Sequence, residues 1–427
     1  MHFERGRDFL RAAQYHHYAA EVALQRYAYR EAITHFTSGL ALLKTVPHSP
    51  ERAQREIALC CALGTALTAT NGYASIAVEQ VFSRAHALWQ QAGSTRPSFP
   101  ICHGLWGFAN VRAELPTALS LGHQLLSLAR TTQDPLHLSL AHNALGATFF
   151  WQGNLRAAQH HYERGLAIKD PASSGSTDFV DDPRVLALSS LSVILSHLGD
   201  MTRAYASADK ALALAQAHGH SHSLALAQCH IATLHQICRS FLAMQNTAAA
   251  GIALSTDKGF PYCLACSTTQ HGWARAMQTA GGEGIEQICQ GVAAYRATGA
   301  VLWQAYFLAL LAEAQLIAGR TAECLQTLTE GLARAEGRGQ LPPQADLYRI
   351  MGDLLLAQEG KNQKLEIPSP QSAMRNPQSE AEACFRKAIA IAKQQQARSL
   401  ELRAVMSLVR LRQRQASEHG PGSAHRA

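Results

Sequence analysis

The residues in this chain best suited to redox or zinc chemistry are Cys263 and Cys266, which form a CxxC pair. Such a pair can exchange a disulfide in a βαβ context, or it can bind zinc together with a second ligand pair at suitable spacing. The sequence supplies neither the βαβ pattern nor the second pair. Cysteines three residues apart share one face of a helix, so we interpret them as packing residues and expect no metal there.

Alternating histidines and adjacent carboxylates form two further candidates. His218, His220 and His222 follow a helical segment and could bind a metal ion, but we favour the interpretation that they form a polar turn between repeats. Asp181 and Asp182 are paired carboxylates in a loop without a defined pocket. The motifs GxxxxGK[ST], GxGxxG, HExxH and GxSxG do not occur in a suitable context. We therefore predict that the chain is not an enzyme and needs no cofactor or metal.

The elements that must position any functional residue follow a 40-residue rhythm. Mostly small residues recur at this step, with one longer step of 46 residues after the third: Ala66, Trp106, Gly146, Ser192, Ala232, Gly272, Ala312 and Gly352. Self-similarity at a fixed period is the signature of a repeat array. An array of this kind usually provides a surface that holds another molecule.

The unit at 145–168 shows what one repeat contains. Gly146 lies on one predicted helix, while Ala158, Tyr162 and Gly165, spaced by four and three, share a face of a second helix. A Gly-Asn turn signal separates the two helices. The spacing resembles the tetratricopeptide repeat (TPR), in which small residues and one aromatic residue define close helix packing. The period here exceeds that family's usual 34 residues, so we expect longer helices or connections.

We therefore predict an all-α superhelix, a TPR-like solenoid of about nine helix pairs plus one terminal helix near residues 397–414. The expected organisation is an N-terminal block at 1–169, a joint loop at 170–183, a C-terminal block at 184–414 with a disordered insertion at 358–380, and a disordered tail at 415–427. The terminal helix has no partner helix, so we expect it to expose an apolar face made of Leu400, Val405, Leu408 and Val409.

The charge and composition limit the possible partners and location. The formal net charge is +7, and the segment from Arg375 to the end carries +6 of it, as expected of a solvated helix face. This local excess weighs against a nucleic-acid partner. No apolar run is long enough to span a membrane, and charges interrupt the N-terminus where a signal peptide would be apolar. With ten cysteines interpreted as free thiols, we expect a cytoplasmic protein.

In TPR arrays the first helix of each pair lines the concave face. Counting from the small residue of each repeat nominates eight residues for a partner-binding groove: Asn143, Phe150, Trp151, His197, Gln236, Trp273, Tyr306 and Arg349. Aromatic rings supply contact area and amides bind peptide backbone, so this set favours recognition of a peptide or protein segment. For each residue the alternative interpretation is packing between neighbouring repeats.

The chain as a whole resembles a narrower family, the C-terminal TPR region of large bacterial signalling proteins. These proteins join a P-loop ATPase module to an adenylate/guanylate cyclase domain. The resemblance covers about residues 5–412 and rests on YREAITHFTSGLALLKTVP (29–47), LWGFANVRAELPTAL (105–119), GWARAMQTAGGEGIEQICQGVAAYRATGA (272–300), YFLALLAEAQLIAGR (306–320), LYRIMGDLLLAQ (347–358) and EAEACFRKAIAIAKQQQARSLELRAVMSLVRL (380–411).

The resemblance implies a regulatory or sensor scaffold whose partner is an ATPase/cyclase polypeptide. It carries over no catalytic or nucleotide-binding residue, because this chain begins inside the repeat region. Two other interpretations remain open. The superhelix could enclose a small molecule and act as a receptor, or the chain could be a truncated gene fragment of such a cyclase.

Overall fold

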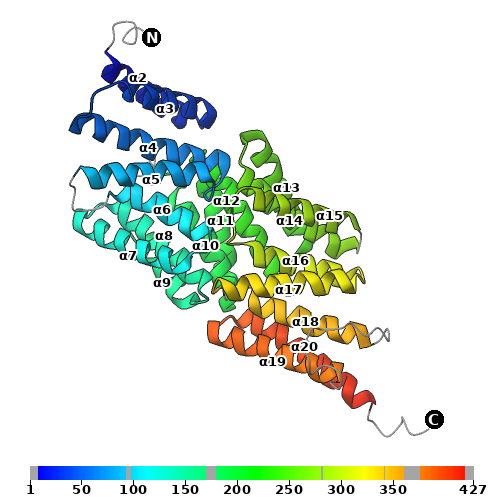
Figure 1. Ribbon diagram of the computed structural model, residues 1–427. Helices are drawn as coiled ribbons and strands as arrows, with labels where there is room; N and C mark the ends of the chain where they lie inside the picture. The colour runs from blue at the N-terminus through cyan, green and yellow to red at the C-terminus, as the bar shows by residue number, and fades with distance from the viewer. Residues whose placement is uncertain are drawn as a thin grey trace.

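The computed structural model describes residues 8–92, 98–169, 179–279, 282–340, 342–359 and 376–418. All regular structure in these ranges is helical, and successive helices pack as antiparallel pairs along a superhelix (Figure 1). None of these helices has the length and apolar content that crossing a membrane requires.

The first helices of the pairs are α2 (Phe9–Gln25), α4 (Pro50–Asn71), α6 (Phe99–Val111), α8 (Pro135–Trp151), α10 (Pro183–Leu198), α12 (Ser221–Ile237), α14 (Pro261–Thr279), α16 (Gln304–Ile317) and α18 (Gln344–Glu359). Their partners are α3 (Tyr29–Leu43), α5 (Ile76–Gln91), α7 (Leu115–Thr132), α9 (Leu155–Leu166), α11 (Met201–Ala217), α13 (Phe241–Lys258), α15 (Gly282–Ala297), α17 (Thr321–Gly337) and α19 (Pro377–Gln395). A final helix, α20 (Arg398–Glu418), follows them. The prediction of nine pairs and one terminal helix is confirmed.

The small residues of the 40-residue rhythm lie where paired helices come closest. A Cβ atom added to Gly146 would lie 2.8 Å from the ring of Tyr162, and one added to Gly352 would lie 2.5 Å from the ring of Phe385. Each aromatic ring therefore occupies the space that a larger residue on the facing helix would need. This knob-and-hole contact is the one that the repeat spacing predicts.

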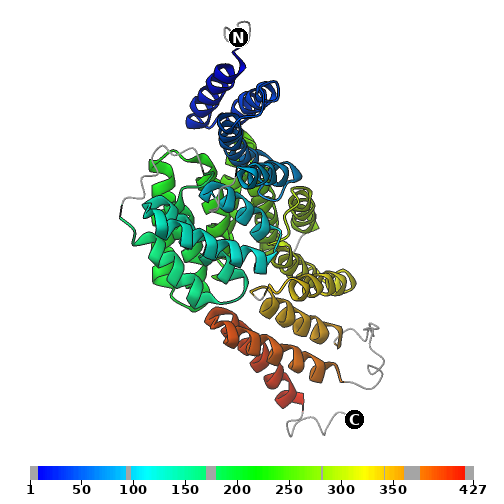
Figure 2. The same cartoon turned by 60° about the vertical axis from the view of Figure 1, so that its left-hand side comes forward.

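The superhelix turns tightly enough for elements five pairs apart to meet. The backbone N–H groups of Val301 and Leu302, at the start of the eighth pair, donate to the carbonyl of Val111 in the third pair, at 2.9 and 3.0 Å. The hydroxyl of Ser399, at the start of α20, donates to the carbonyl of His197 in the fifth pair at 3.3 Å. Consequently the blue-to-cyan pairs lie beside the green-to-yellow pairs in both views (Figures 1 and 2).

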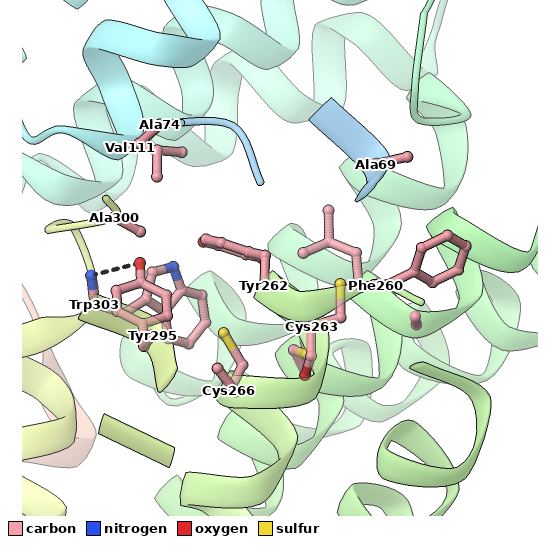
Figure 3. Packing of buried hydrophobic residues seen from close by; sticks show 14 of the residues in the cluster. Ala69, Ala74, Val111, Phe260, Tyr262, Cys263, Cys266, Tyr295, Ala300 and Trp303 are labelled. Carbon is pink, nitrogen blue, oxygen red and sulfur yellow. Dashed lines mark hydrogen bonds between the residues drawn. The ribbon is translucent and has the colours of Figure 1, made fainter. Parts of the chain in front are cut away.

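Apolar packing reinforces these contacts between successive turns. Ala74 and Val111 from the first turn belong to the same buried cluster as Ala300 and Trp303 from the second (Figure 3). Trp151 meets Trp303 edge to face, with 5.6 Å between ring centroids. We call this set the seam: Ala74, Val111, Trp151 and His197 against residues 298–303 and Ser399.

The described helices extend into both segments that the sequence predicts to be disordered. In the insertion predicted at 358–380, residues 358–359 continue α18 and residues 377–380 begin α19, which Asn376 caps; residues 360–375 lie outside the described residues. In the tail predicted at 415–427, residues 415–418 belong to α20 because Gln, Ala and Glu sustain a helix, and the rest lies outside the described residues. The division into two blocks at 170–183 stays a prediction.

The predicted apolar face of the terminal helix is partly wrong. Leu400 is buried, and Val405 and Leu408 are half-buried, because α20 packs on α18, α19 and the end of α10. Only Val409 of the predicted set is exposed; Leu402 and Met406 accompany it. The exposed stripe is therefore rotated around the helix from the predicted one.

The seam predicts that two similar glycine substitutions will differ in effect. Gly299 (φ +79°) and Gly339 (φ +64°) both occupy turns between pairs in the left-handed region. Replacing either with alanine strains the backbone by about 1 kcal/mol. At Gly299 the new Cβ would also lie 2.5 Å from the carbonyl oxygen of Ala74, whereas at Gly339 it would meet nothing within 4 Å.

We expect Gly299→Ala to lower the melting temperature clearly more than Gly339→Ala, by the equivalent of a further 1–3 kcal/mol, roughly the range for overpacking. Small-angle scattering should show a larger radius of gyration for Gly299→Ala alone. Equal melting temperatures and equal radii for the two variants would show that the seam does not hold the turns together.

Candidate functional site

A cavity of about 180 Å³, partly open to solvent, lies on the inside of the superhelix, and we call it the channel. The first helices of the pairs, from α4 to α18, supply most of its wall together with α20. The residues between helices that complete it are Tyr73, Phe179–Asp181, Leu302, Trp303, Pro342 and Pro343. The second helices contribute only Phe82 and Tyr162. The expectation that the first helices line the inner face therefore agrees with the structure.

Aromatic residues from four elements form the middle of the channel wall. Trp303 stacks on His230 with an interplanar angle of 10°, and it meets Tyr306 edge to face. Phe150 lies 6.0 Å from the ring of His197, measured between centroids. These rings provide a rigid apolar surface that loses little conformational entropy when it contacts a ligand.

Six of the eight residues nominated for the groove line the channel. They are Phe150, Trp151, His197, Gln236, Tyr306 and Arg349. They come from α8, α10, α12, α16 and α18. Counting positions from the small residue of each repeat therefore identified residues on the inner face. Their role in binding a partner stays a prediction.

The other two nominated residues do not line the channel. Asn143 is buried and its side-chain amide donates to the carbonyl of Pro183 at 2.7 Å, which ties α8 to the start of α10. Trp273 is fully buried, and its indole N–H donates to Glu313 at 3.2 Å. The packing interpretation holds for both, because their positions on the inner helices are covered by the next repeat.

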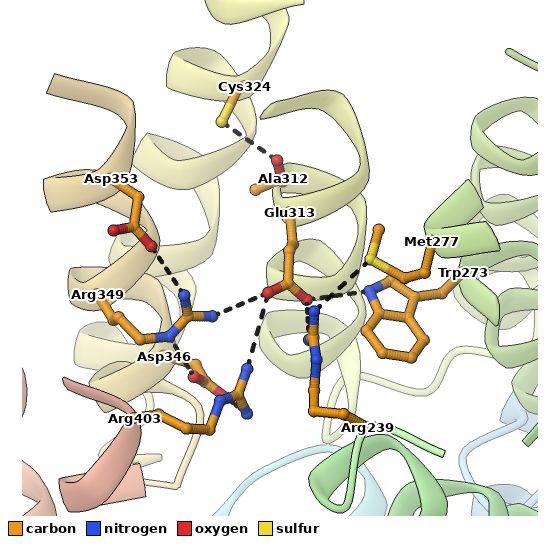
Figure 4. A network of polar contacts seen from close by, with 10 residues as sticks. All are labelled: Arg239, Trp273, Met277, Ala312, Glu313, Cys324, Asp346, Arg349, Asp353 and Arg403. Atoms are coloured by element: carbon orange, nitrogen blue, oxygen red, sulfur yellow. Dashed lines mark hydrogen bonds and ion pairs between the residues drawn. The ribbon is translucent and has the colours of Figure 1, made fainter. Parts of the chain in front are cut away.

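Glu313 forms the centre of a buried ion network at one end of the channel (Figure 4). Arg239 donates to it at 2.8 Å, Arg349 at 3.1 Å, and Arg403 lies 3.7 Å away. Burial alone would raise the pKa of Glu313, but the three guanidinium groups hold the pKa below its ordinary value. Glu313 is therefore ionised at neutral pH although it is buried.

Arg349 connects three carboxylates within this network. It donates to Glu313, to Asp346 at 3.1 Å and to Asp353 at 2.9 Å. Burial raises the pKa of Asp346, but Arg403 and Arg349 outweigh it and lower that pKa to about 2. The sequence nominates Arg349 for the partner-binding groove, and the structure shows its guanidinium already bonded to three carboxylates.

The adjacent aspartates and the alternating histidines, which are separate motifs in the sequence, come together beside the channel. Asp181 accepts hydrogen bonds from His222 Nδ1 at 2.9 Å and from the hydroxyl of Tyr73. Asp182 caps α10 and bonds His218 Nδ1 at 2.8 Å. Within the described residues no group of three or more His, Cys, Asp or Glu side chains could hold a metal ion. These contacts fasten the loop before α10 to α12.

Burial keeps the channel histidines neutral. His103, which the sequence did not single out, lines the channel with His197 and His230. Burial lowers the pKa of each of the three to about 4. No motif surrounds His103, so only its place on the inner face of α6 could have indicated this position.

The CxxC cysteines lie inside the protein, away from the channel. Cys263 and Cys266 are buried on α14 as free thiols, and the thiol of Cys229 on α12 donates to the carbonyl of Cys263 at 3.6 Å. Burial raises the pKa of Cys266 well above its ordinary value. The three thiols pack α12 against α14 (Figure 3).

No protein-family model matches the sequence, and no curated protein matches it. Solved structures do resemble it. A Rap protein complexed with competence and sporulation factor superposes with a TM-score of 0.51 at 10% identity, over 85% of this chain and 99% of that one. Yeast Tom70 (TM-score 0.41, 10% identity, 98% and 95% coverage) and a tetratricopeptide repeat protein from Parabacteroides merdae (0.31, 11%, 82% and 99%) also match. The predicted TPR-like solenoid fold is confirmed.

The ion network predicts a large effect for one buried arginine and a small effect for an exposed one. Arg349→Met would leave three carboxylates with fewer partners, which we expect to destabilise the fold by about 3–5 kcal/mol. Arg386→Met removes a guanidinium that is 66% exposed and paired with Glu382, and about 0–1 kcal/mol is expected. Thermal and urea unfolding measure both; similar losses in the two variants would contradict the buried network.

The buried histidines predict how stability depends on pH. Burial lowers the folded-state pKa of His103, His142, His161, His197 and His230 to about 4, from an ordinary value of 6.5. Between these values the unfolded chain binds more protons than the folded one, so stability falls as the pH drops from 6.5 towards 4. Melting temperatures measured from pH 7.5 to 4.5 should decline in that window, and less steeply in His197→Phe. A flat profile would contradict the burial of these rings.

Proposed function

We propose that this protein is a non-enzymatic interaction scaffold that binds a peptide or protein segment in its central channel. The observation that carries the proposal is the channel itself, which nearly every helix pair helps to build. Phe150 and Tyr306 offer rings for contact, and Gln236 offers an amide that can bond peptide backbone. These residue types suit recognition by shape and hydrogen bonds.

The seam affects how such a segment would enter. Contacts between the third and eighth pairs, and between the fifth pair and the terminal helix α20, join one turn of the superhelix to the next. A bound segment would therefore enter lengthwise from an end of the channel, unless the seam opens. This constraint favours a short extended segment over a folded domain.

The finer part of the proposal is a regulatory or sensor role in bacterial signalling, with an ATPase/cyclase polypeptide as the partner. The sequence resemblance to the TPR regions of such proteins supports it. The Rap protein of similar fold was solved with competence and sporulation factor, which fits the use of this fold in signalling. The ten free cysteines suit a reducing, cytoplasmic compartment.

A small-molecule receptor is the second candidate function. The observation that favours it is a pair of buried polar atoms in the channel, Asn110 Oδ1 and His197 Nδ1, which have no hydrogen-bond partner. An enclosed, mostly apolar cavity with a few polar atoms is typical of small-ligand sites.

Display of a random peptide library against the immobilised protein tests the principal proposal. Peptides enriched on the wild type should bind the double variant Phe150→Ala/Gln236→Ala at least tenfold more weakly, because both side chains face the channel. Leu242→Ala, on the exposed face of α13, serves as the control and should bind them unchanged. Enriched peptides that bind all three proteins equally would place recognition outside the channel and overturn the proposal.

The partner class needs a separate experiment. Segments of an ATPase/cyclase polypeptide from the same genome can be co-expressed with the wild type and with Phe150→Ala/Gln236→Ala. Co-purification with the wild type alone is the expected result. If no segment co-purifies with either protein, the partner is not a polypeptide of this class.

A further inference from the structure

Each charged side chain that lines the channel, among the residues that the structure describes, already has a hydrogen-bond or ion-pair partner. Among the described residues that line it, Glu313 and Asp346 pair with Arg349 and Arg403. Asp181, the remaining carboxylate, accepts one hydrogen bond on each oxygen. A charged ligand would have to break these pairs or lose its hydration without compensation, and both are costly in a buried site.

Among the described residues of the same wall, three polar atoms have no hydrogen-bond partner, namely Asn110 Oδ1, His197 Nδ1 and the hydroxyl oxygen of Tyr306. Asn110 on α6 is 6% exposed and His197 on α10 is 8% exposed, and neither Asn110 Oδ1 nor His197 Nδ1 has a hydrogen-bond partner. Both residues line the channel. A buried polar atom without a partner destabilises the protein, so a ligand that pairs with it gains affinity and specificity. Asn110 Oδ1 can only accept, so the matching ligand atom is an N–H or O–H donor.

The remaining wall is largely aromatic and positioned for ring contacts. Trp303 is held between Trp151 and His230, and Tyr306 and Phe150 face the same space. Ring faces and edges pair best with another aromatic group, in stacked or edge-to-face geometry. The channel thus combines paired charges, three polar atoms without a hydrogen-bond partner and an aromatic surface.

We propose that the channel holds an uncharged aromatic group with a hydrogen-bond donor, such as a tryptophan or tyrosine residue within a bound peptide, whose ring donor pairs with Asn110 Oδ1. This inference rests on the proposed function, because it specifies the chemistry of the segment that the channel binds. A ring without a hydrogen-bond donor leaves Asn110 Oδ1 without a partner, and a charged group would have to break the ion pairs of Glu313 and Asp346. We therefore expect the channel to bind both kinds of group more weakly.

Three capped amino acids test this selection in isothermal titration of the full chain. N-acetyl-tryptophanamide is uncharged and has a ring donor, N-acetyl-phenylalaninamide lacks the ring donor, and N-acetyl-tryptophan carries a carboxylate. We expect the second and third to bind about tenfold or more weakly than the first, the size of effect that an unpaired buried polar group produces. Equal binding of the three, or no heat from any of them near its solubility limit, would overturn the proposal.

Gly107 on α6 allows the channel to be blocked without disturbing a contact. A Cβ added there meets only the ring of Tyr73, at an ordinary 3.8 Å, and the position lines the channel. Gly107→Leu should therefore fill the space and abolish binding of N-acetyl-tryptophanamide. Gly337→Leu is the matched control. Gly337 lies in a helix as Gly107 does, but it is exposed and has open space around its Cβ position. Unchanged binding to Gly107→Leu would place the probe elsewhere and overturn the proposal.

Asn110→Leu provides a second test that does not depend on blocking. It removes the acceptor, so the preference for N-acetyl-tryptophanamide over N-acetyl-phenylalaninamide should shrink to about threefold or less. Circular dichroism checks that each variant is folded. If Gly107→Leu does not fold, the proposal is judged by the ligand preference of Asn110→Leu alone. A preference that stays at tenfold in Asn110→Leu would exclude Asn110 as the partner of the ring donor.

The inference and the proposed function can fail separately. Library peptides that depend on Phe150 but carry no tryptophan or tyrosine would overturn the inference and leave the peptide scaffold standing. Binding of free indole as tight as that of N-acetyl-tryptophanamide, blocked by Gly107→Leu, with no enriched peptide, would support the aromatic selection. It would also identify the protein as a small-molecule receptor instead of a peptide scaffold.

Discussion

The approach distance between paired helices determines the shape of the whole molecule. Gly146 and Gly352 let the rings of Tyr162 and Phe385 sit against the facing helix backbone, which a larger side chain would prevent. Because the same close contact recurs every 40 residues, the small rotation between pairs adds up to a superhelix. The rotation here is large enough for pairs five apart to touch, and that closure turns an open groove into a channel.

The fold was predictable from the sequence because its determinants are local. The spacing of Ala158, Tyr162 and Gly165 repeats along the chain, and the contacts within a pair join neighbouring helices, as Gly146 and Tyr162 do. The seam was not predictable in this way. Val111 and Val301 meet only after rotations of five pairs have accumulated, and no periodic signal marks either residue. Apolar residues at a seam resemble those of any inter-repeat contact.

The same distinction explains which site residues were found. Counting along the first helices identifies the inner face, so Phe150, Gln236 and Tyr306 were placed in the channel wall. The count cannot tell whether the next repeat covers a position, which is why Trp273 proved to be buried packing. Nor can the count predict hydrogen bonds between residues far apart in sequence, such as the one between His222 and Asp181.

Arg349 shows how these buried partners change the functional interpretation. The sequence nominates this arginine for binding a partner segment, but in the structure its guanidinium is already paired with Glu313, Asp346 and Asp353. This network joins α16, α18 and α20, and α20 in turn bonds His197 through the seam. A ligand that drew Arg349 away would therefore weaken the closure that forms its own binding site. A ligand recognised through rings and hydrogen bonds leaves that closure intact, so the buried charges stabilise the channel while the uncharged wall accounts for its selectivity.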